Sequence, residues 1–571
     1  MATFNRPGVY IQESLNPVAP QAVSNAASIG AFIGSNDRGP TTPTLVSSWN
    51  QYTTLFGQWN TSASNDLPIA VYLFFANGGS STYVTRITAS GAQTATRSLN
   101  DRGGTPAPTL SLTAANPGTW GNTLYVTIAD STLTGYFDVT IYQGGTSDAY
   151  VVERFTSVSM TSSDSRYAVI IINANSKYVT ALDAASTQTG AAKNPAVQSL
   201  TQLTGGTNGS NSATITNVTA AAGTVTYTAV NSFVQGQVVS ITGVTPSAYN
   251  LTNVTIASAT GTQFTVGNAA TGTYSNGGTA TVAVLGVSSA LTLHDSIKSS
   301  LIMNLPGYTD AYSINLAISY AAGRGDVFVV VDGKDDTVTN QLTAASSYTA
   351  TSQAAVYYPR FSISDPTLGA GSSSAVTKLV APGGAIVGLY SLTDSSRGVW
   401  KAPAGLTARL AGPVSITSLT NSELDTLNTA AAPVNAIRYI PGSGIVVMGA
   451  RTTKPGYIDM YVPVRRTLIY IEKSLKDLTQ FALFEPNDQK LWRRVEGVID
   501  NLLMEIWQQG GLKGGTPSAA YFIKCDADNN PQNLIDNGEL HVEVGVSLQR
   551  PAEFVIIKVS QYDGGTVVTV S

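Results

Sequence analysis

The chain has 571 residues, which is enough for roughly two to five domains. Charged residues make up only 12% of the sequence and the formal net charge is −4, so a nucleic-acid-binding protein with a basic face is not expected. The single cysteine, Cys525, excludes an internal disulfide and a multi-thiolate zinc site, and we expect it to be a small buried side chain.

The N-terminal residues 1–25 are too few to form a domain. Val9, Tyr10 and Ile11 are the centre of a short β-prone run, and a lone strand is not stable in water. The segment is therefore either a disordered tail or an arm that pairs with its own fold or with another molecule. It lacks the apolar region of a secretory signal, and no apolar run in the chain approaches the ~20 residues of a membrane span. We expect synthesis and assembly in the cytoplasm, without membrane insertion.

Residues 26–100 and 288–435 predict the two halves of one central α/β domain. Val327–Gly333 is a continuous apolar run, which is typical of a strand buried on both faces of a sheet. The other elements expected here are strands at 28–34, 83–87 and 355–359 and helices at 69–76, 312–322, 339–352 and 383–390.

Two β modules are expected between these halves. Residues 104–204 contain β-prone runs separated by Gly, Ser and Asp turns, which predicts a barrel or sandwich. Residues 205–287 predict a second, all-β module inserted in a surface loop, where insertions are tolerated. No Lys, Arg, Asp or Glu occurs from Asn194 to His294, so this module is expected to be an outward decoration. It is either a spacer or a binding module for a glycan or host surface.

Residues 436–571 predict an α+β domain followed by a C-terminal arm. Two helices are expected, with Asn487 as the N-cap of the second. The apolar face of the first comprises Leu468, Ile471, Leu475, Leu478 and Phe481, and that of the second Leu491, Val495, Val498, Leu502 and Ile506. Arg465, Arg466, Lys473 and Lys476 lie mostly off the first of these faces. The period then changes to two at 541–546 and, less regularly, at 554–559, which predicts strands.

The sequence offers little material for catalysis, and we expect neither an enzyme nor a bound cofactor or metal. A serine hydrolase needs a histidine base, and the two histidines, His294 and His541, lie in different predicted domains. Neither a Gly-x-Ser-x-Gly elbow nor a phosphate-binding loop is present. Asp332 at a strand end and Asp526–Asn530 are better interpreted as turn residues.

Several motifs follow one another in the C-terminal domain. They are Gly449–Thr452, Arg465–Arg466, Phe484–Asn487, Trp492, Trp507 with Gly510–Leu512, Cys525–Asp526 and Pro551–Phe554. In this order they resemble the C-terminal domain of contractile phage tail sheath proteins. Pro7–Tyr10, Pro117–Asn122 and Arg397–Pro403 resemble other parts of the same family. Met448 stands where the family more often has an aromatic residue, which we interpret as a variation in core packing.

The resemblance covers roughly residues 5–100 and 290–562 and implies a structural sheath subunit of a virion tail. Such subunits form hexameric rings stacked helically around a tail tube and contract to drive the tube through the host envelope. The implied partners are identical copies, the tube protein, the baseplate and the tail terminator. Because no ATP-binding motif is present, the work would come from a metastable assembly.

The resemblance also implies that terminal arms add strands to neighbouring copies. We expect the linking strands to contain Val9, Tyr10 and Ile11 at one end and Phe554, Ile556 and Val559 at the other. A turn signal at Asp563–Gly565 leaves open which C-terminal strand is donated.

Four basic residues on the two C-terminal helices, Lys473, Lys476, Arg493 and Arg494, are expected either to face an acidic tube or to form a solvated helix face. A second hypothesis for the whole chain is a host- or glycan-binding adhesin on a virion surface, in which the uncharged module would be the binding part.

Overall fold

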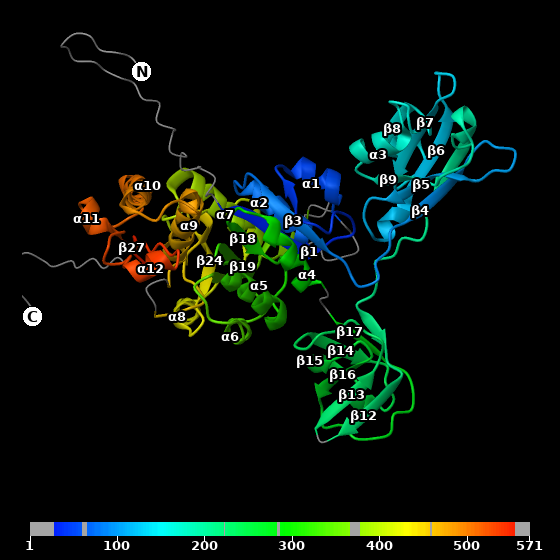
Figure 1. The fold of residues 1–571 in the computed structure, drawn as a ribbon. Coiled ribbons are helices and arrows are strands. Elements are labelled where there is room, and N and C mark those ends of the chain that lie inside the picture. The colour runs from blue at the N-terminus through cyan, green and yellow to red at the C-terminus, as the bar shows by residue number, and fades with distance from the viewer. Residues whose placement is uncertain are drawn as a thin grey trace, which may run out of the picture.

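The computed structural model describes residues 28–59, 66–221, 223–282, 286–365, 377–456 and 460–553. Figure 1 shows a central α/β body with two β-rich units on one side and a helical C-terminal unit on the other. The chain is thus a mixed α/β protein with several separate sheets.

An eight-stranded sheet forms the centre of the body, in the order β2-β3-β1-β18-β19-β20-β24-β25. Its two edge strands, β2 and β25, are antiparallel to their neighbours, and the other pairings are parallel. The strands are β1 (Ile29–Ser35), β2 (Thr44–Val46), β3 (Thr82–Ile87), β18 (Leu301–Asn304), β19 (Val327–Asp332), β20 (Ala354–Tyr358), β24 (Val434–Ile440) and β25 (Gly444–Val447). Every residue of β18, β19 and β20 is buried, as the apolar run at 327–333 predicts for the middle strand.

Helices cover both faces of this sheet and form two separate cores. One face carries α1 (Trp49–Phe56), α2 (Asp66–Ala76) and α7 (Gly383–Arg397). The other face carries α4 (Val287–Thr292), α5 (Ala311–Arg324), α6 (Val338–Ser346) and α8 (Asn421–Thr429). Gly384 and Gly388 let α7 lie close against α2, because a Cβ at either position would meet α2 backbone atoms at 2.2 to 2.4 Å. A small sheet of β21 (Phe361–Ser364), β22 (Thr377–Val380) and β23 (Pro413–Ile416) completes the body.

The first β-rich unit contains two sheets and one helix around its own core. The sheets have the orders β10-β6-β7-β8 and β4-β5-β9. The elements are β4 (Thr96–Asn100), β5 (Pro108–Ala114), β6 (Leu124–Asp130), β7 (Phe137–Gln143), β8 (Val151–Val158), α3 (Ala168–Asn175), β9 (Val179–Asp183) and β10 (Gln198–Gln202).

The second unit is all β, with the strand order β11-β17-β14-β15-β16-β13-β12. Its strands are β11 (Ser212–Thr214), β12 (Asn217–Ala221), β13 (Thr224–Thr228), β14 (Val238–Thr242), β15 (Leu251–Ala259), β16 (Gln263–Gly267) and β17 (Thr279–Val282). Its first and last strands pair with each other, and Val282 N donates to Asn211 O at 3.0 Å. The two connections to the rest of the chain therefore lie side by side, as an insertion requires.

The C-terminal unit contains α9 (Val462–Leu478), α10 (Gln489–Gln508), α11 (Pro517–Ala520), β26 (Tyr521–Lys524), α12 (Gln532–Asp536) and β27 (Glu543–Val546). These elements enclose a fifth core, which includes Cys525. No helix among the described residues is long and apolar enough to cross a membrane.

Two predicted boundaries differ from the structure. β4 was expected in the central domain, which we placed up to residue 100, but it pairs with β5 in the first β unit. β24 extends past the expected start of the C-terminal domain at residue 436, and β24 and β25 both belong to the central sheet. Both differences arise from strand pairings between distant parts of the chain, which local sequence patterns do not report.

His294 gives the central body a predictable response to pH. Its side chain is fully buried, with Nδ1 2.8 Å from Ala290 O and Nε2 3.3 Å from Thr85 Oγ1. Burial lowers the pKa of His294 below its ordinary value of 6.5, although the Ala290 carbonyl opposes the shift. The unfolded chain therefore binds the proton more readily. As pH falls through 6.5 towards the folded pKa, the stability that His294 contributes above that range is lost.

We expect the urea concentration at which the central body is half unfolded to be lower at pH 5.5 than at pH 7.5. Hydrogen exchange of β18 and β19 monitors the unfolding of this body. The fall should be smaller in His294→Gln. An unchanged pH dependence in His294→Gln would contradict this assignment.

Candidate functional site

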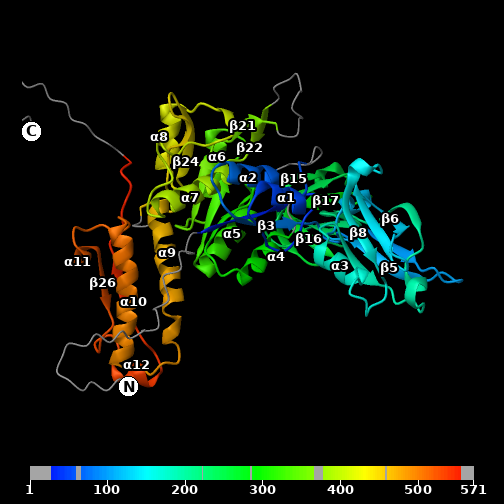
Figure 2. The same cartoon turned by 90° about the horizontal axis from the view of Figure 1, so that it is seen from above.

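The helices α9 and α10 lie side by side as a hairpin that projects from the central body (Figure 2). Pro463 stands in the first turn of α9, where its fixed φ and missing N–H are tolerated. Asp488 caps α10 by accepting hydrogen bonds from Lys490 N and Leu491 N at 2.9 Å. The predicted N-cap, Asn487, is therefore wrong by one residue. Its Oδ1 instead accepts a hydrogen bond from Trp492 Nε1 at 2.7 Å.

A buried ion pair joins this hairpin to the central body. Arg466 on α9 binds Asp394 on α7 through both guanidinium NH₂ groups, with Nη1 2.8 Å from Oδ1. The two side chains are only 2% and 4% exposed. The guanidinium also lies over the Tyr390 ring, 4.7 Å from its centroid.

Arg466 lies off the predicted apolar face of α9, but it is buried on another face of that helix. It stands four residues after Val462 and three before Ile469, both of which are buried, and this helical spacing could have placed it on the buried face. Burial raises the pKa of Asp394, and the Arg466 charge opposes that shift. Neither charge has access to water, so each depends on the other.

The four predicted tube-facing residues all lie on the hairpin. Lys473 Nζ is 3.1 Å from Asp477 Oδ1, and the Arg494 guanidinium lies over the Phe481 ring at 4.4 Å. Lys476 and Arg493 are exposed. The four residues thus lie on the same helical hairpin. The side chains of Lys473 and Arg494 contact other residues of the hairpin.

The strands β26 and β27 form an antiparallel sheet of only two strands, and no third strand of the described residues pairs with them. Phe522 on β26 is 54% exposed, and its ring lies against Gly545 on β27, where a Cβ would be only 2.0 Å from the ring. A two-stranded sheet is marginal by itself and has unpaired N–H and C=O groups along its outer edges. The predicted linking residues, Val9, Tyr10, Ile11, Phe554, Ile556 and Val559, lie outside the described residues.

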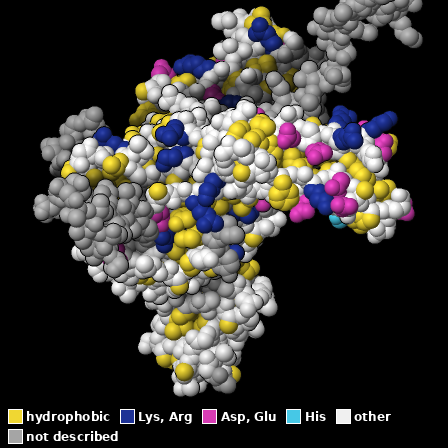
Figure 3. Space-filling view, turned by 90° about the vertical axis from the view of Figure 1, so that its left-hand side faces the viewer, with side chains coloured by type: hydrophobic (Ala, Val, Ile, Leu, Met, Phe, Trp, Pro, Cys, Tyr) yellow, Lys and Arg dark blue, Asp and Glu magenta, His cyan; other side chains and the backbone are white. Residues whose placement is uncertain are grey.

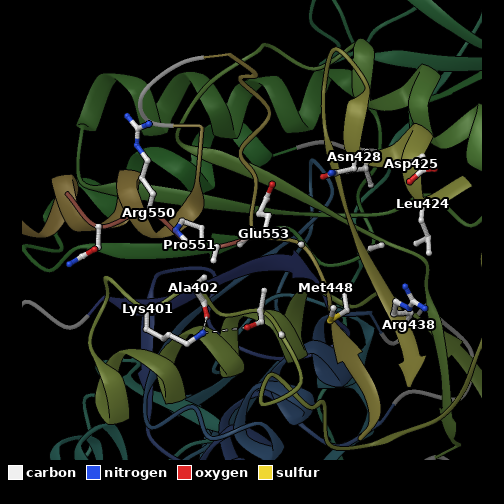
Figure 4. A pocket seen from close by; sticks show the side chains of 18 of the residues that line it. Lys401, Ala402, Leu424, Asp425, Asn428, Arg438, Met448, Arg550, Pro551 and Glu553 are labelled. Atoms are coloured by element: carbon white, nitrogen blue, oxygen red, sulfur yellow. Dashed lines mark hydrogen bonds between the residues drawn. The ribbon is translucent and has the colours of Figure 1, made fainter. Parts of the chain in front are cut away.

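A pocket of about 520 Å³ lies at the base of the hairpin (Figure 4). Its lining comes from the segment 400–405, from α8 and β24, from residues 448–450 after β25, and from the last described segment, 549–553. Met448 lines the pocket and is 42% exposed, so its interpretation as a core residue is wrong.

An ion pair fixes the last described residue beside this pocket. Glu553 accepts hydrogen bonds from Arg451, with Nε 3.0 Å from Oε1, and both side chains are largely buried. This bond raises the pKa of Arg451. The sequence motifs contained both residues, but motif order alone could not indicate that they bind each other. The chain therefore continues towards its C-terminus from a defined point near the base of α9.

The residues considered for catalysis occupy structural positions. Asp332 is buried and accepts hydrogen bonds from Gly383 N at 2.6 Å and Gly307 N at 2.9 Å, so it caps α7. Burial raises the pKa of Asp332. His541 is half-exposed, with Nε2 2.9 Å from Glu539 Oε2. Among the described residues, no group of three or more His, Cys, Asp or Glu side chains is placed to hold a metal ion.

The second β unit presents an uncharged surface, visible as the white and yellow lower part of Figure 3. The aromatic side chains of Tyr227, Tyr249 and Phe264 are buried in its own core, and that of Tyr274 is partly buried. The large apolar side chains that it does expose are Val230 and Val234.

A family model of the phage tail sheath C-terminal domain matches residues 460–561. The resemblance to contractile phage tail sheath proteins is therefore confirmed. A tail sheath protein of Vibrio phage KVP40 is 27% identical over 177 residues, or 30% of this chain. The match spans 25% of that relative's length.

Solved sheath structures share the fold over nearly the whole chain. A sheath tail protein from Listeria innocua has a TM-score of 0.55 at 12% identity, covering 92% of this chain and 97% of its own. The helical sheath of the anti-feeding prophage in the contracted state has a TM-score of 0.52 at 20% identity and covers 98% and 100%. The contracted sheath complex of an extracellular contractile injection system gives 0.50 at 21%, with 98% and 99% covered.

Removing one partner of the Arg466–Asp394 pair should loosen the hairpin. Asp394→Ala leaves Arg466 charged and buried, so we expect a loss of about 3–5 kcal/mol in unfolding free energy. The measurement is the urea midpoint together with hydrogen exchange of α9. The control is the apolar double variant Asp394→Leu with Arg466→Met, which should be much closer to the wild type. Equal losses in the two variants would show that the ion pair is not what fixes α9.

Proposed function

We propose that this chain is the structural subunit of a contractile tail sheath. Copies would polymerise around a tail tube, as hexameric rings stacked helically, and contract to drive the tube through a host envelope. The supporting observation is the two-stranded β26–β27 sheet, which has unpaired edges and lies in the domain that matches the sheath family. The proposed partners are identical copies, the tube protein, the baseplate and the tail terminator, and the proposed location is the virion tail after assembly in the host cytoplasm.

We further propose a division of labour along the chain. Residues 1–25 and the end of the chain would be arms, the domain from about 460 would be the sheath core, and the central α/β body would supply outer contacts. The two β-rich units would be decorations inserted between the halves of the body. For the second unit, a spacer is favoured over a glycan-binding module. Four of its five large aromatic side chains are buried and Tyr274 is partly buried, whereas stacking on a sugar needs an exposed ring.

Strand exchange would connect the copies. An arm that pairs with β26 or β27 satisfies several backbone groups at once, each worth about 0.5–1.5 kcal/mol net. These bonds must be lost together for an arm to leave, so the connections would persist while the subunits rotate. The larger contacts made by the outer units after rotation would then provide the free energy of contraction.

Deleting residues 1–20 tests the arms. We expect a folded, soluble monomer in place of polymers, because the linking strand with Val9, Tyr10 and Ile11 is removed. Negative-stain microscopy and sedimentation measure the outcome. The control removes residues 207–285, whose two ends lie side by side, and should still polymerise. Full-length sheaths from the 1–20 deletion would contradict strand donation by this arm, whereas loss of polymers only in the control would favour a binding or contact role for the inserted unit.

Charge reversal tests the tube-facing surface. Lys476→Glu with Arg493→Glu changes two exposed side chains, so folding should be unaffected. Assembly templated on the purified tube protein should fall by about tenfold or more. The matched control is Lys177→Glu with Lys298→Glu, two exposed lysines elsewhere on the chain. Extended tails of normal length and yield in the first variant would contradict a tube contact at these residues.

A further inference from the structure

The turn between α9 and α10 exposes two large apolar residues in a strained backbone. Phe484 is fully exposed and Leu483 is 70% exposed. Phe484 also adopts a φ of 64°, a left-handed conformation that is rare for a side chain of this size. Glu485 and Pro486, which follow, are exposed as well. We refer to residues 483–486 as the hairpin tip.

No contact within the described part of the chain explains the strain and the exposure of the hairpin tip. Phe484 packs against none of the five cores, and Glu485 has no ion-pair partner among the described residues. Backbone strain of this kind is concentrated at functional sites. An apolar wedge next to a carboxylate indicates a partner with an apolar cavity and a nearby cation.

The pocket at the base of the hairpin has these properties. Apolar side chains that include Ala402, Ala436 and Met448 line it, and its volume of about 520 Å³ accommodates an aromatic ring. Arg438 lies beside Met448 at the pocket, as Figure 4 shows, and has no carboxylate partner in the described part of the chain. Asp425 lies on the same side, so the mouth carries both charges.

The hairpin tip cannot reach the pocket of its own chain. The pocket includes Ala450, before the start of α9, whereas the tip follows the end of that helix. The 17 residues of α9 separate the two by roughly 25 Å at 1.5 Å per residue. The Arg466–Asp394 pair and the α9–α10 packing hold the helix in place.

We propose that the hairpin tip of one copy inserts into this pocket of a second copy, with Phe484 among the apolar side chains and Glu485 paired with Arg438. The two surfaces are at different places on one chain, so the contact is heterologous and propagates from copy to copy. It is a side-chain contact, separate from the proposed strand exchange. The inference rests on the proposed self-assembly of the chain, which requires that copies meet.

A charge exchange tests the pairing in full-length protein. Glu485→Arg and Arg438→Glu should each reduce polymer yield in sedimentation by about tenfold, and the double variant Glu485→Arg with Arg438→Glu should recover it to within about threefold. Asp335→Arg, at an exposed carboxylate near α6, is the control and should polymerise as the wild type does. Polymers of normal yield from both single variants would overturn the inference and leave the proposed function standing. Loss in both single variants without recovery in the double would also overturn the pairing.

Disulfide trapping provides a second measurement that does not depend on polymer yield. A copy with Phe484→Cys, mixed with a copy with Met448→Cys, should give a disulfide-linked dimer on oxidation, and neither variant alone should. The native Cys525 is buried, so the wild type sets a low background. The absence of this dimer overturns the proposal.

A dimer formed instead between Tyr10→Cys and Met448→Cys would show that the N-terminal segment occupies the pocket, and would overturn it too. If the wild type also fails to polymerise under any condition, the proposed function itself is wrong.

Discussion

The buried ion pair between Arg466 and Asp394 determines where the C-terminal hairpin leaves the central sheet. Two opposite charges without access to water must stay together, because separating them exposes each to an apolar surrounding. The bidentate geometry adds directional specificity, because both NH₂ groups of Arg466 bind the Asp394 carboxylate. The basic residues of the hairpin, the β26–β27 sheet and the hairpin tip are all positioned through this helix. The contacts that we propose for the hairpin with another molecule therefore depend on this pair.

The strands and helices of the central body follow from local sequence patterns, whereas their pairing does not. Apolar runs such as Val327–Gly333 predict fully buried strands because both faces of a parallel sheet are covered. The membership of β4 and β24 could not be predicted in the same way, because it depends on partners far along the chain. The burial of individual charged residues was even harder to predict from the sequence. Arg466 and Arg451 are buried only because a carboxylate from a distant segment meets each of them.

For the candidate site, the sequence predicted the C-terminal domain and its exposed basic residues, but not the contacts between distant segments. Lys476 and Arg493 are exposed on the hairpin as a basic surface requires, whereas the pocket at Met448 was missed because it forms between segments that are distant in sequence. A molecule built in this way separates two tasks. In the proposed sheath, the hairpin and its two-stranded sheet would offer edges for other copies, and the central body holds that hairpin at a fixed place. The insertion of the second β unit leaves both tasks undisturbed, because this unit is attached through adjacent strands.

The most direct test of the account is a cryo-electron microscopy reconstruction of the polymer formed by the full-length chain, at a resolution that traces the backbone. We predict that β26 and β27 are extended by at least one strand from a neighbouring copy, so that a continuous sheet connects the subunits. A reconstruction in which both terminal segments return to their own subunit, with no strand shared between copies, would contradict the account.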